Sequence, residues 1–364
     1  MRVVAADEVW PALGPALEDG APLATVAEGD AAALATLAPD IPVAEADAGI
    51  LTVTSGSTGA PKAVVLSRAA LRAATDALHD RLGGTGVWTC ALPVNFVAGM
   101  MTLVRSRYAG TRPRFARPDL GDLAPGSGRE YLSIVATQLH RALERPDVLA
   151  RLRDFAAVVV GGSAIPPGLV ARAREEGIAL VTSYGMSETC GGCVYDGRPL
   201  ADVEVGTDAV GRLWIAGPTL FSGYRLRPDL TAEALAGGRF RTADRGIVDP
   251  DGRLRVLGRA DDVVISGGVN VDLAHLQRLL DAAAPVPVVV LGVPDADWGT
   301  RVVAATTGRI ALAELHRLLD VAPAALPREL RRFAAFPRTA NGKLDRQKMA
   351  AEWSATDGDG SPVD

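Results

Sequence analysis

Short apolar runs alternate with helix-forming patterns along residues 50–260, and this alternation restricts the fold more than any other feature of the chain. Such alternation is typical of α/β layers, in which the carboxyl ends of parallel strands gather at one edge of a sheet. We therefore predict a large α/β domain whose ligand site lies where its strands end. The expected strands are 50–53, 88–92, 133–136, 156–160 and 179–182, and the expected helices are 67–82 and 137–143.

The pattern changes beyond residue 200. Glycine-separated apolar runs in 202–258 indicate a small antiparallel β subdomain. A compact α+β pattern begins near Asp261, and the last eleven residues are polar. We expect a large domain over 1–260, a small C-terminal α+β domain over 261–353 and a disordered tail over 354–364. Expected elements are strands at 211–216, 253–257, 287–292 and 302–306 and helices at 272–283 and 311–319.

Composition and charge argue against several classes of protein. The formal charge of -5 disfavours a nucleic-acid partner, because phosphate-backbone binding requires a concentrated basic face. No run approaches the roughly 20 apolar residues that span a bilayer, and the amino end lacks a signal-peptide pattern. We therefore expect a cytoplasmic protein without a membrane partner. The 3 cysteines and 4 scattered histidines indicate neither a disulfide framework nor a metal cluster, and the histidines are more simply packing or helix-surface residues.

The run 54–62, TSGSTGAPK, has the composition of a loop that wraps a polyphosphate. Glycines let backbone N–H groups approach anionic oxygens, hydroxyls add donors, and Lys62 adds a compact positive charge. The run is not a Walker A loop, because no Ser or Thr follows the lysine. We expect it at a strand-to-helix junction, with a plain surface turn as the alternative. The expected phosphate contacts are Thr54, Ser55, Gly56, Ser57, Thr58, Gly59 and Lys62.

Five motifs in a fixed order resemble the acyl/aryl adenylate-forming superfamily, which includes acyl-CoA synthetases, peptide-synthetase adenylation domains and luciferases. The resemblance covers roughly residues 50–350 and implies the fold of that superfamily, with a small C-terminal domain that moves. The motifs are the phosphate loop at 54–62, YGMSET at 184–189, RTAD at 241–244, the hinge motif at 258–268 and the terminal lysine motif at 337–343.

The resemblance implies an enzyme that uses ATP and Mg²⁺ to convert a carboxylate into an acyl-adenylate. Glu188 would be the catalytic carboxylate linked to the metal ion, and Lys343 would bond the substrate carboxylate and the α-phosphate. Asp244 would accept hydrogen bonds from the ribose hydroxyls, and Arg259 would be a ribose or phosphate contact. The further nucleotide contacts that the resemblance implies are Gly161, Gly162, Ser163, Tyr184, Gly185 and Ser187.

A second half-reaction is also implied by the resemblance. Rotation of the small domain about the hinge residue Asp261 would withdraw Lys343 and bring in Gly267 and Gly268. This exchange would open a path for the thiol of CoA, whose slim pantetheine arm suits a Gly-Gly backbone. A simple turn is the alternative explanation for the two glycines.

Within the superfamily, the chain is similar to o-succinylbenzoate-CoA ligases of menaquinone biosynthesis, in particular actinobacterial ones. It shares their reduced amino end and the run SYGMSETCGGCVYDG at 183–197. Asn95-Phe96 departs from the aromatic-histidine pair that the family usually has. Cys190 and Cys193 are interpreted as small lining residues rather than redox groups. The implied acyl-pocket residues are Asn95, Phe96, Gly99, Arg105, Thr137, Gly191 and Gly192.

Several alternatives stay open. An unreacted second carboxylate would need a cation or several donors, which Arg105 or Thr137 could supply, although Arg105 could equally be a helix-surface residue. The acid could be another aromatic carboxylate, and the acceptor could be a carrier-protein thiol. A non-catalytic nucleotide-binding paralogue is disfavoured by the retained motif residues. A homodimer is compatible with the sequence but not implied by it.

Overall fold

The computed structural model describes residues 1–55, 61–338 and 344–356. The chain forms two compact units. Unit 1 comprises 1–206, 214–242 and 248–255, and unit 2 comprises 207–213, 243–247 and the chain from Val256 on. Residues 1–49 belong to unit 1. Motion about Asp261 stays a prediction.

A seven-stranded sheet lies at the centre of unit 1 and confirms the expected α/β layering. Strands β9, β8, β7, β5 and β6 are parallel neighbours, and β10 and β11 add an antiparallel edge. In spatial order the strands are β11 (Arg198–Pro199), β10 (Gly191–Tyr195), β9 (Leu180–Met186), β8 (Ala157–Gly161), β7 (Glu130–Val135), β5 (Val87–Cys90) and β6 (Arg114–Phe115).

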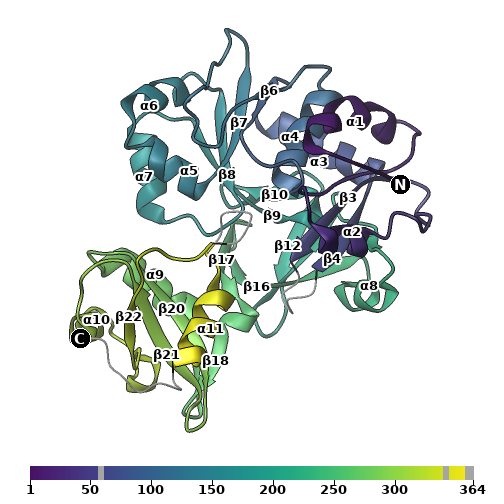
Figure 1. Ribbon diagram of the computed structural model, residues 1–364. Helices are drawn as coiled ribbons and strands as arrows, with labels where there is room; N and C mark the ends of the chain where they lie inside the picture. The colour runs from purple at the N-terminus through teal and green to yellow at the C-terminus, as the bar shows by residue number, and fades with distance from the viewer. Residues whose placement is uncertain (56–60, 339–343, 357–364) are drawn as a thin grey trace. The chain divides into compact units, whose positions relative to one another are not determined.

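Helices of unit 1 cover this sheet from both sides. Leu132 of β7 and Val158 of β8 lie in one buried cluster with α5, α6 and α7, which Figure 1 shows beside these strands. Helices α3 and α4 share a second cluster with Cys90 of β5. The helices are α1 (Val9–Leu17), α2 (Ala31–Leu37), α3 (Arg68–Arg81), α4 (Val97–Tyr108), α5 (Ala136–Ala142), α6 (Pro146–Leu152), α7 (Pro167–Glu175) and α8 (Pro228–Ala234).

The second sheet of unit 1 corrects the expected setting of the phosphate loop. Strands β3 and β4 pair antiparallel with Thr54 opposite Lys62, so the loop follows a strand and leads into a strand, not a helix. The buried run 63–66 pairs with β3, and Pro61 occupies the first position of β4, where a missing N–H is tolerated. The sheet order is β1 (Arg2–Val4), β2 (Leu23–Thr25), β3 (Ala48–Ser55), β4 (Pro61–Ser67) and β14 (Gly223–Tyr224).

A second correction concerns the strand expected at 179–182, which extends further in the structure. Strand β9 continues through Met186, and a single 3₁₀ turn, η2 (Ser187–Thr189), follows it. The strand is longer than expected because β10 pairs with it antiparallel, with Met186 opposite Gly191. Glu188 therefore lies in the tight connection between two paired strands.

The strands expected in 202–258 are present as a further sheet. Its order is β12, β13, β16 and β15, with β17 also paired to β16. The bounds are β12 (Glu204–Thr207), β13 (Arg212–Ala216), β15 (Leu235–Ala236), β16 (Arg239–Val248) and β17 (Leu254–Arg259).

Unit 2 contains a five-stranded sheet between two buried clusters, as the α+β pattern predicts. Val288 and Val290 pack with α9, whereas Val289 and Leu291 pack with α11, because successive side chains of a strand point to opposite faces. The elements are β18 (Val263–Ser266), β19 (Val269–Asp272), β20 (Val288–Asp295), β21 (Gly299–Thr306), β22 (Leu330–Arg332), α9 (Leu273–Ala283), α10 (Leu312–Leu318) and α11 (Arg346–Thr356).

Helix α11 extends to Thr356, three residues into the segment predicted as a tail. The fully buried Trp353 holds this end of the helix against β20. Residues 357–364 lie outside the described part of the chain. None of the helices described is long and apolar enough to cross a membrane.

Candidate active site

Glu188 and Tyr224 meet in unit 1. The Tyr224 hydroxyl donates a hydrogen bond of 2.8 Å to Glu188 Oε1. Burial and the neighbouring carboxylate raise the pKa of Tyr224, so the phenol remains a proton donor at neutral pH. Lys62 Nζ lies 5.1 Å from the centre of the Tyr224 ring, within the range of a cation–π interaction. One phenol thus contacts a residue from each of two predicted nucleotide-binding motifs.

The surroundings of Glu188 fit a magnesium ion that takes most of its ligands from nucleotide and water. Among the described residues, no group of three or more His, Cys, Asp or Glu side chains could hold a metal. Mg²⁺ commonly uses one or two carboxylates together with substrate phosphates and waters. The half-buried carboxylate of Glu188 suits that mode, because the described residues around it form no cage of three or more protein ligands. The metal-linked role of Glu188 stays a prediction.

Close packing explains two glycines among the predicted nucleotide contacts at 161–163 and 184–187. A Cβ on Gly185 would collide with the Gly191 carbonyl, and a Cβ on Gly161 would lie 2.9 Å from the Ser183 carbonyl oxygen. These glycines therefore allow the ends of β8, β9 and β10 to approach one another. Around them, Tyr184 is half-buried, Ser187 is buried, and Gly162 and Ser163 are exposed.

The phosphate loop is described only at its two ends. Thr54 lies near the end of β3 and Lys62 is the second residue of β4, and both are half-buried. Ser55 is the last residue of β3. Gly56, Ser57, Thr58 and Gly59 lie outside the described residues, as does Lys343.

Arg105 is the most unusual of the predicted acyl-pocket residues. Its side chain lies on α4 with only 4% of the residue exposed, so the alternative of a helix-surface residue is wrong. The guanidinium carbon lies 4.8 Å from the centre of the Trp88 ring. Within the described part of the chain, no carboxylate pairs with Arg105, and its buried Nε has no hydrogen-bond partner. Burial lowers the pKa of Arg105.

Two predicted glycines lie close to this cation or to its neighbours. A Cβ on Gly191 would lie 3.8 Å from Arg105 Nη2. A Cβ on Gly192 would collide with the hydroxyls of Ser183 and Tyr195. The hairpin of β9 and β10 therefore lies beside Arg105, and its glycines leave no side chain between the two.

Asn95, Phe96 and Gly99 lie where β5 leads into α4. The Thr52 hydroxyl on β3 donates a 3.5 Å hydrogen bond to the Asn95 carbonyl. Asn95 and Phe96 are half-buried. Gly99 is buried, and a Cβ there would collide with the Pro93 carbonyl. This glycine lets the first turn of α4 pack against the strand end.

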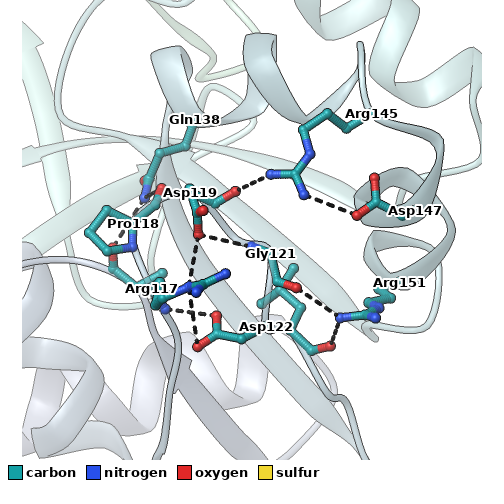
Figure 2. A network of polar contacts seen from close by, with 11 residues as sticks. Arg117, Pro118, Asp119, Gly121, Asp122, Gln138, Arg145, Asp147 and Arg151 are labelled. Carbon is teal, nitrogen blue, oxygen red and sulfur yellow. Dashed lines mark hydrogen bonds and ion pairs between the residues drawn. The ribbon is translucent and has the colours of Figure 1, made fainter.

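Gln138 holds the half-buried Thr137 at the start of α5, and sequence reasoning gave it no role. Its amide nitrogen donates to the carbonyls of Ala91 (3.1 Å) and Pro118 (3.0 Å), and its amide oxygen accepts from the Val135 N–H. Figure 2 shows Gln138 above the segment 117–122, which Arg145 and Arg151 bind through its carbonyls. Thr137, the second residue of α5, therefore has a fixed position beside the end of β5.

Unit 2 brings three predicted residues together. Arg259 donates two hydrogen bonds to the Asp261 carboxylate, at 2.8 and 3.0 Å, and its Nη1 lies 3.9 Å from Asp244 Oδ1. The hydrogen bond to Asp261 is the main cause of a raised pKa at Arg259. The predicted ribose carboxylate, its neighbouring arginine and the predicted hinge residue thus form one charged cluster.

The predicted CoA-side glycines form a tight turn in unit 2. Gly267 and Gly268 have φ values of +56° and +81°, which favour glycine. A Cβ on Gly267 would also lie 2.5 Å from the ring of Trp298. Both the backbone conformation and the indole therefore exclude a larger residue at position 267.

Comparisons with known proteins concern the family and the fold of the chain. The model of the AMP-binding enzyme family matches residues 6–225, which is more than half of the chain. The chain is 40% identical over 331 residues to a protein named probable 2-succinylbenzoate–CoA ligase from Mycobacterium tuberculosis, and the match covers 85% of each chain. It is 29% identical to the 2-succinylbenzoate–CoA ligase of Enterococcus faecalis, with 82% of this chain and 68% of that protein covered.

A solved structure gives the same result for the fold. The O-succinylbenzoate coenzyme A synthetase of Bacillus subtilis, in complex with ATP and magnesium, matches with a TM-score of 0.72 and 26% identity. The match covers 84% of this chain and 70% of that one. The expected adenylate-forming fold is thereby confirmed. The chain belongs to the AMP-binding enzyme family.

Proposed function

We propose that this chain is an AMP-forming carboxylate–CoA ligase that activates 2-succinylbenzoate with ATP and transfers the acyl group to CoA, a step of menaquinone biosynthesis. Membership of the AMP-binding enzyme family and the 40% identical relative support the reaction type. The choice of 2-succinylbenzoate as the acid rests on the environment of Arg105. Arg105 is a buried cation for which no described residue supplies a negative charge.

A dicarboxylate substrate would supply a negative charge that pairs with Arg105. Burying an unpaired charge is costly, and an arginine paired with a carboxylate makes short, charge-assisted hydrogen bonds. One carboxylate of the substrate would react, and the other would pair with Arg105. A monocarboxylate would leave the guanidinium without a partner, so the site would bind it more weakly.

The reaction proceeds in two displacements. A carboxylate oxygen of the acid attacks the α-phosphorus of ATP, a P–O bond breaks, and pyrophosphate leaves. The sulfur of CoA, having lost its proton, then attacks the acyl carbonyl, and AMP leaves. In the first step Lys62 and the hydroxyls of the phosphate loop would neutralise phosphate charge, and Lys343 would bridge the carboxylate and the α-phosphate. Mg²⁺ bound at Glu188 would supply further positive charge for the pyrophosphate.

The localisation, assembly and acceptor belong to the same proposal. We infer a cytoplasmic enzyme that acts on small molecules, with CoA as the thiol and a homodimer as one assembly to be tested. A ligase for another aromatic acid is the second candidate, because Asn95-Phe96 departs from the family pattern at the acyl pocket. That candidate predicts that a single carboxylate suffices for full activity.

Pyrophosphate release with a matched set of acids tests the proposal. 2-Succinylbenzoate is compared with 3-benzoylpropionate, which lacks the ring carboxylate, and with 2-butyrylbenzoate, which lacks the chain carboxylate. We expect the full dicarboxylate to be preferred at least roughly 10-fold in kcat/KM, because charge-assisted hydrogen bonds contribute about 1.5–3 kcal/mol. The analogue that retains activity identifies the carboxylate that reacts.

Arg105→Gln is the variant that tests recognition of the second carboxylate, and Arg107→Gln is its control. Arg107 lies on the same helix with its side chain 43% exposed. Arg105→Gln should lower turnover of 2-succinylbenzoate to that of the active analogue, and Arg107→Gln should not. Equal activity with all aromatic acids would favour the second candidate. Acyl transfer to a carrier protein but not to CoA would show that the acceptor is a carrier-protein thiol. No pyrophosphate release with any acid would indicate a nucleotide-binding paralogue.

A further inference from the structure

Three buried side chains from three elements of unit 1 lie in series: His79 on α3, Trp88 on β5 and Arg105 on α4. They are 4%, 0% and 4% exposed, respectively. The indole Nε1 of Trp88 donates a 3.0 Å hydrogen bond to His79 Nε2. The Arg105 guanidinium lies over the ring of the same tryptophan.

His79 is a neutral acceptor in this arrangement. Burial, followed by the charge of Arg105, lowers its pKa from 6.5 to about 4, and the opposing effects of Asp76 and Asp80 are smaller. The hydrogen bond from Trp88 requires an unprotonated Nε2, which agrees with the neutral form. A second positive charge beside Arg105 is thereby avoided.

The indole of Trp88 has few ways to move. Its N–H is the only hydrogen-bond donor of its side chain, and His79 occupies it. Tyr131 packs against it with ring centres 4.9 Å apart, and the Tyr131 hydroxyl is in turn bonded to the Gly84 carbonyl at 2.7 Å. The face on which Arg105 lies is therefore fixed from two directions.

We propose that His79 is a positioning residue for substrate selection: by holding the Trp88 indole, it fixes the surface that orients the Arg105 guanidinium toward the second carboxylate of the acid. This inference rests on the proposed function, because it assigns His79 to the recognition of a dicarboxylate. It also explains why a histidine occupies a core position where an apolar residue would otherwise fill the space.

Kinetics of four variants with 2-succinylbenzoate and its active monocarboxylate analogue test the inference. His79→Leu leaves the indole N–H without its acceptor, Trp88→Phe removes the N–H but keeps an aromatic face, and the double variant combines the two. His79→Gln keeps an acceptor oxygen. Thr75→Val is the matched control, since Thr75 is buried on the same helix one turn away and has no hydrogen-bond partner for its hydroxyl among the described residues.

We expect His79→Leu to raise KM for 2-succinylbenzoate roughly 5- to 10-fold, while KM for ATP and for the analogue stays within about 2-fold. His79→Gln should recover most of this loss, and Thr75→Val should resemble the wild type. The double variant should be no worse than Trp88→Phe alone, because His79 acts only through the indole N–H. Additive losses in the double variant would overturn the inference.

The two proposals fail in different ways. If the wild type does not prefer the dicarboxylate, the proposed function is wrong and this inference is wrong with it. If the wild type prefers the dicarboxylate and Arg105→Gln abolishes that preference, whereas His79→Leu lowers turnover of both acids equally, the proposed function stands. In that case His79 merely fills the core. Thermal unfolding of each variant identifies any that fails to fold. If His79→Leu does not fold, Trp88→Phe, which removes the same hydrogen bond, carries the test: it should raise KM for 2-succinylbenzoate and leave KM for the analogue unchanged.

Discussion

The hydroxyl of Tyr224 donates a 2.8 Å hydrogen bond to the carboxylate of Glu188, which lies 36 residues earlier in the chain. Tyr224 lies on β14, which pairs antiparallel with β4, and Glu188 lies in the turn after β9. The same tyrosine ring lies under the ammonium group of Lys62. Tyr224 thus fixes the direction of the carboxylate that is expected to bind the metal ion and keeps it beside a cation of the phosphate loop.

Tyr224→Phe should weaken the use of magnesium ATP while leaving the acid site intact. Hydrogen bonds to charged groups contribute about 1.5–3 kcal/mol, so we expect kcat/KM for magnesium ATP to fall roughly 10-fold or more. Pyrophosphate release measured against magnesium concentration at fixed ATP checks this. Tyr108→Phe is the control, because the Tyr108 hydroxyl donates only a long 3.5 Å bond to the Arg68 carbonyl. An unchanged magnesium dependence would show that Tyr224 does not contribute to metal binding through Glu188.

Lys343→Ala should separate the two half-reactions. The lysine is expected to act only while the adenylate forms, so pyrophosphate release should be lost and CoA thioester formation from supplied acyl-adenylate should persist. Lys348→Ala, an exposed position on α11, serves as the control. Rapid-quench assays of each step provide the measurement. A similar loss in both steps would show that Lys343 has a different role.

The three cysteines should be unreactive in the folded enzyme. Cys90, Cys190 and Cys193 are free thiols and are buried. Burial raises the pKa of all three, to about 12 for Cys193, and the thiolate is the reactive form. A chromogenic disulfide reagent should label none of them in native buffer and all three in denaturant. Labelling of Cys190 or Cys193 in the native protein would contradict their interpretation as packed lining residues.

Several residues of the candidate site were marked in the sequence by a local motif. The strand expected at 156–160 was recognised as an apolar run, and the motif from Tyr184 to Thr189 was recognised because its residue types have fixed spacings. Tyr224, Gln138 and the pair of His79 and Trp88 were not recognised. Each of them contacts a partner on another element, and such contacts produce no periodic residue pattern in the sequence.

The two wrong local predictions have a common physical cause. A strand follows the phosphate loop because β4 pairs with β3. Strand β9 extends through Met186 because β10 pairs with it. Glycines and polar residues at 183–192 are typical of a loop by intrinsic preference. Here the glycines permit close strand approach, so pairing between strands outweighs local propensity.

Protonation of His79 should make the folded state less stable in mild acid. Its pKa is about 4 in the folded protein against the ordinary histidine value of 6.5 in the unfolded chain, so the unfolded chain binds more protons between these values. The free energy of unfolding should therefore fall as the pH drops from 6.5 to 4, by about 3 kcal/mol from this group, and the contribution should be constant outside that window. The charged groups beside His79 are Arg105, Asp76 and Asp80. Urea unfolding at several pH values in the wild type, His79→Gln and His140→Gln measures the effect. Only His79→Gln should flatten the pH dependence, because His140 is exposed on α5. Parallel curves for all three proteins would mean that His79 is already charged in the fold, and a charged imidazole could not accept the Trp88 hydrogen bond.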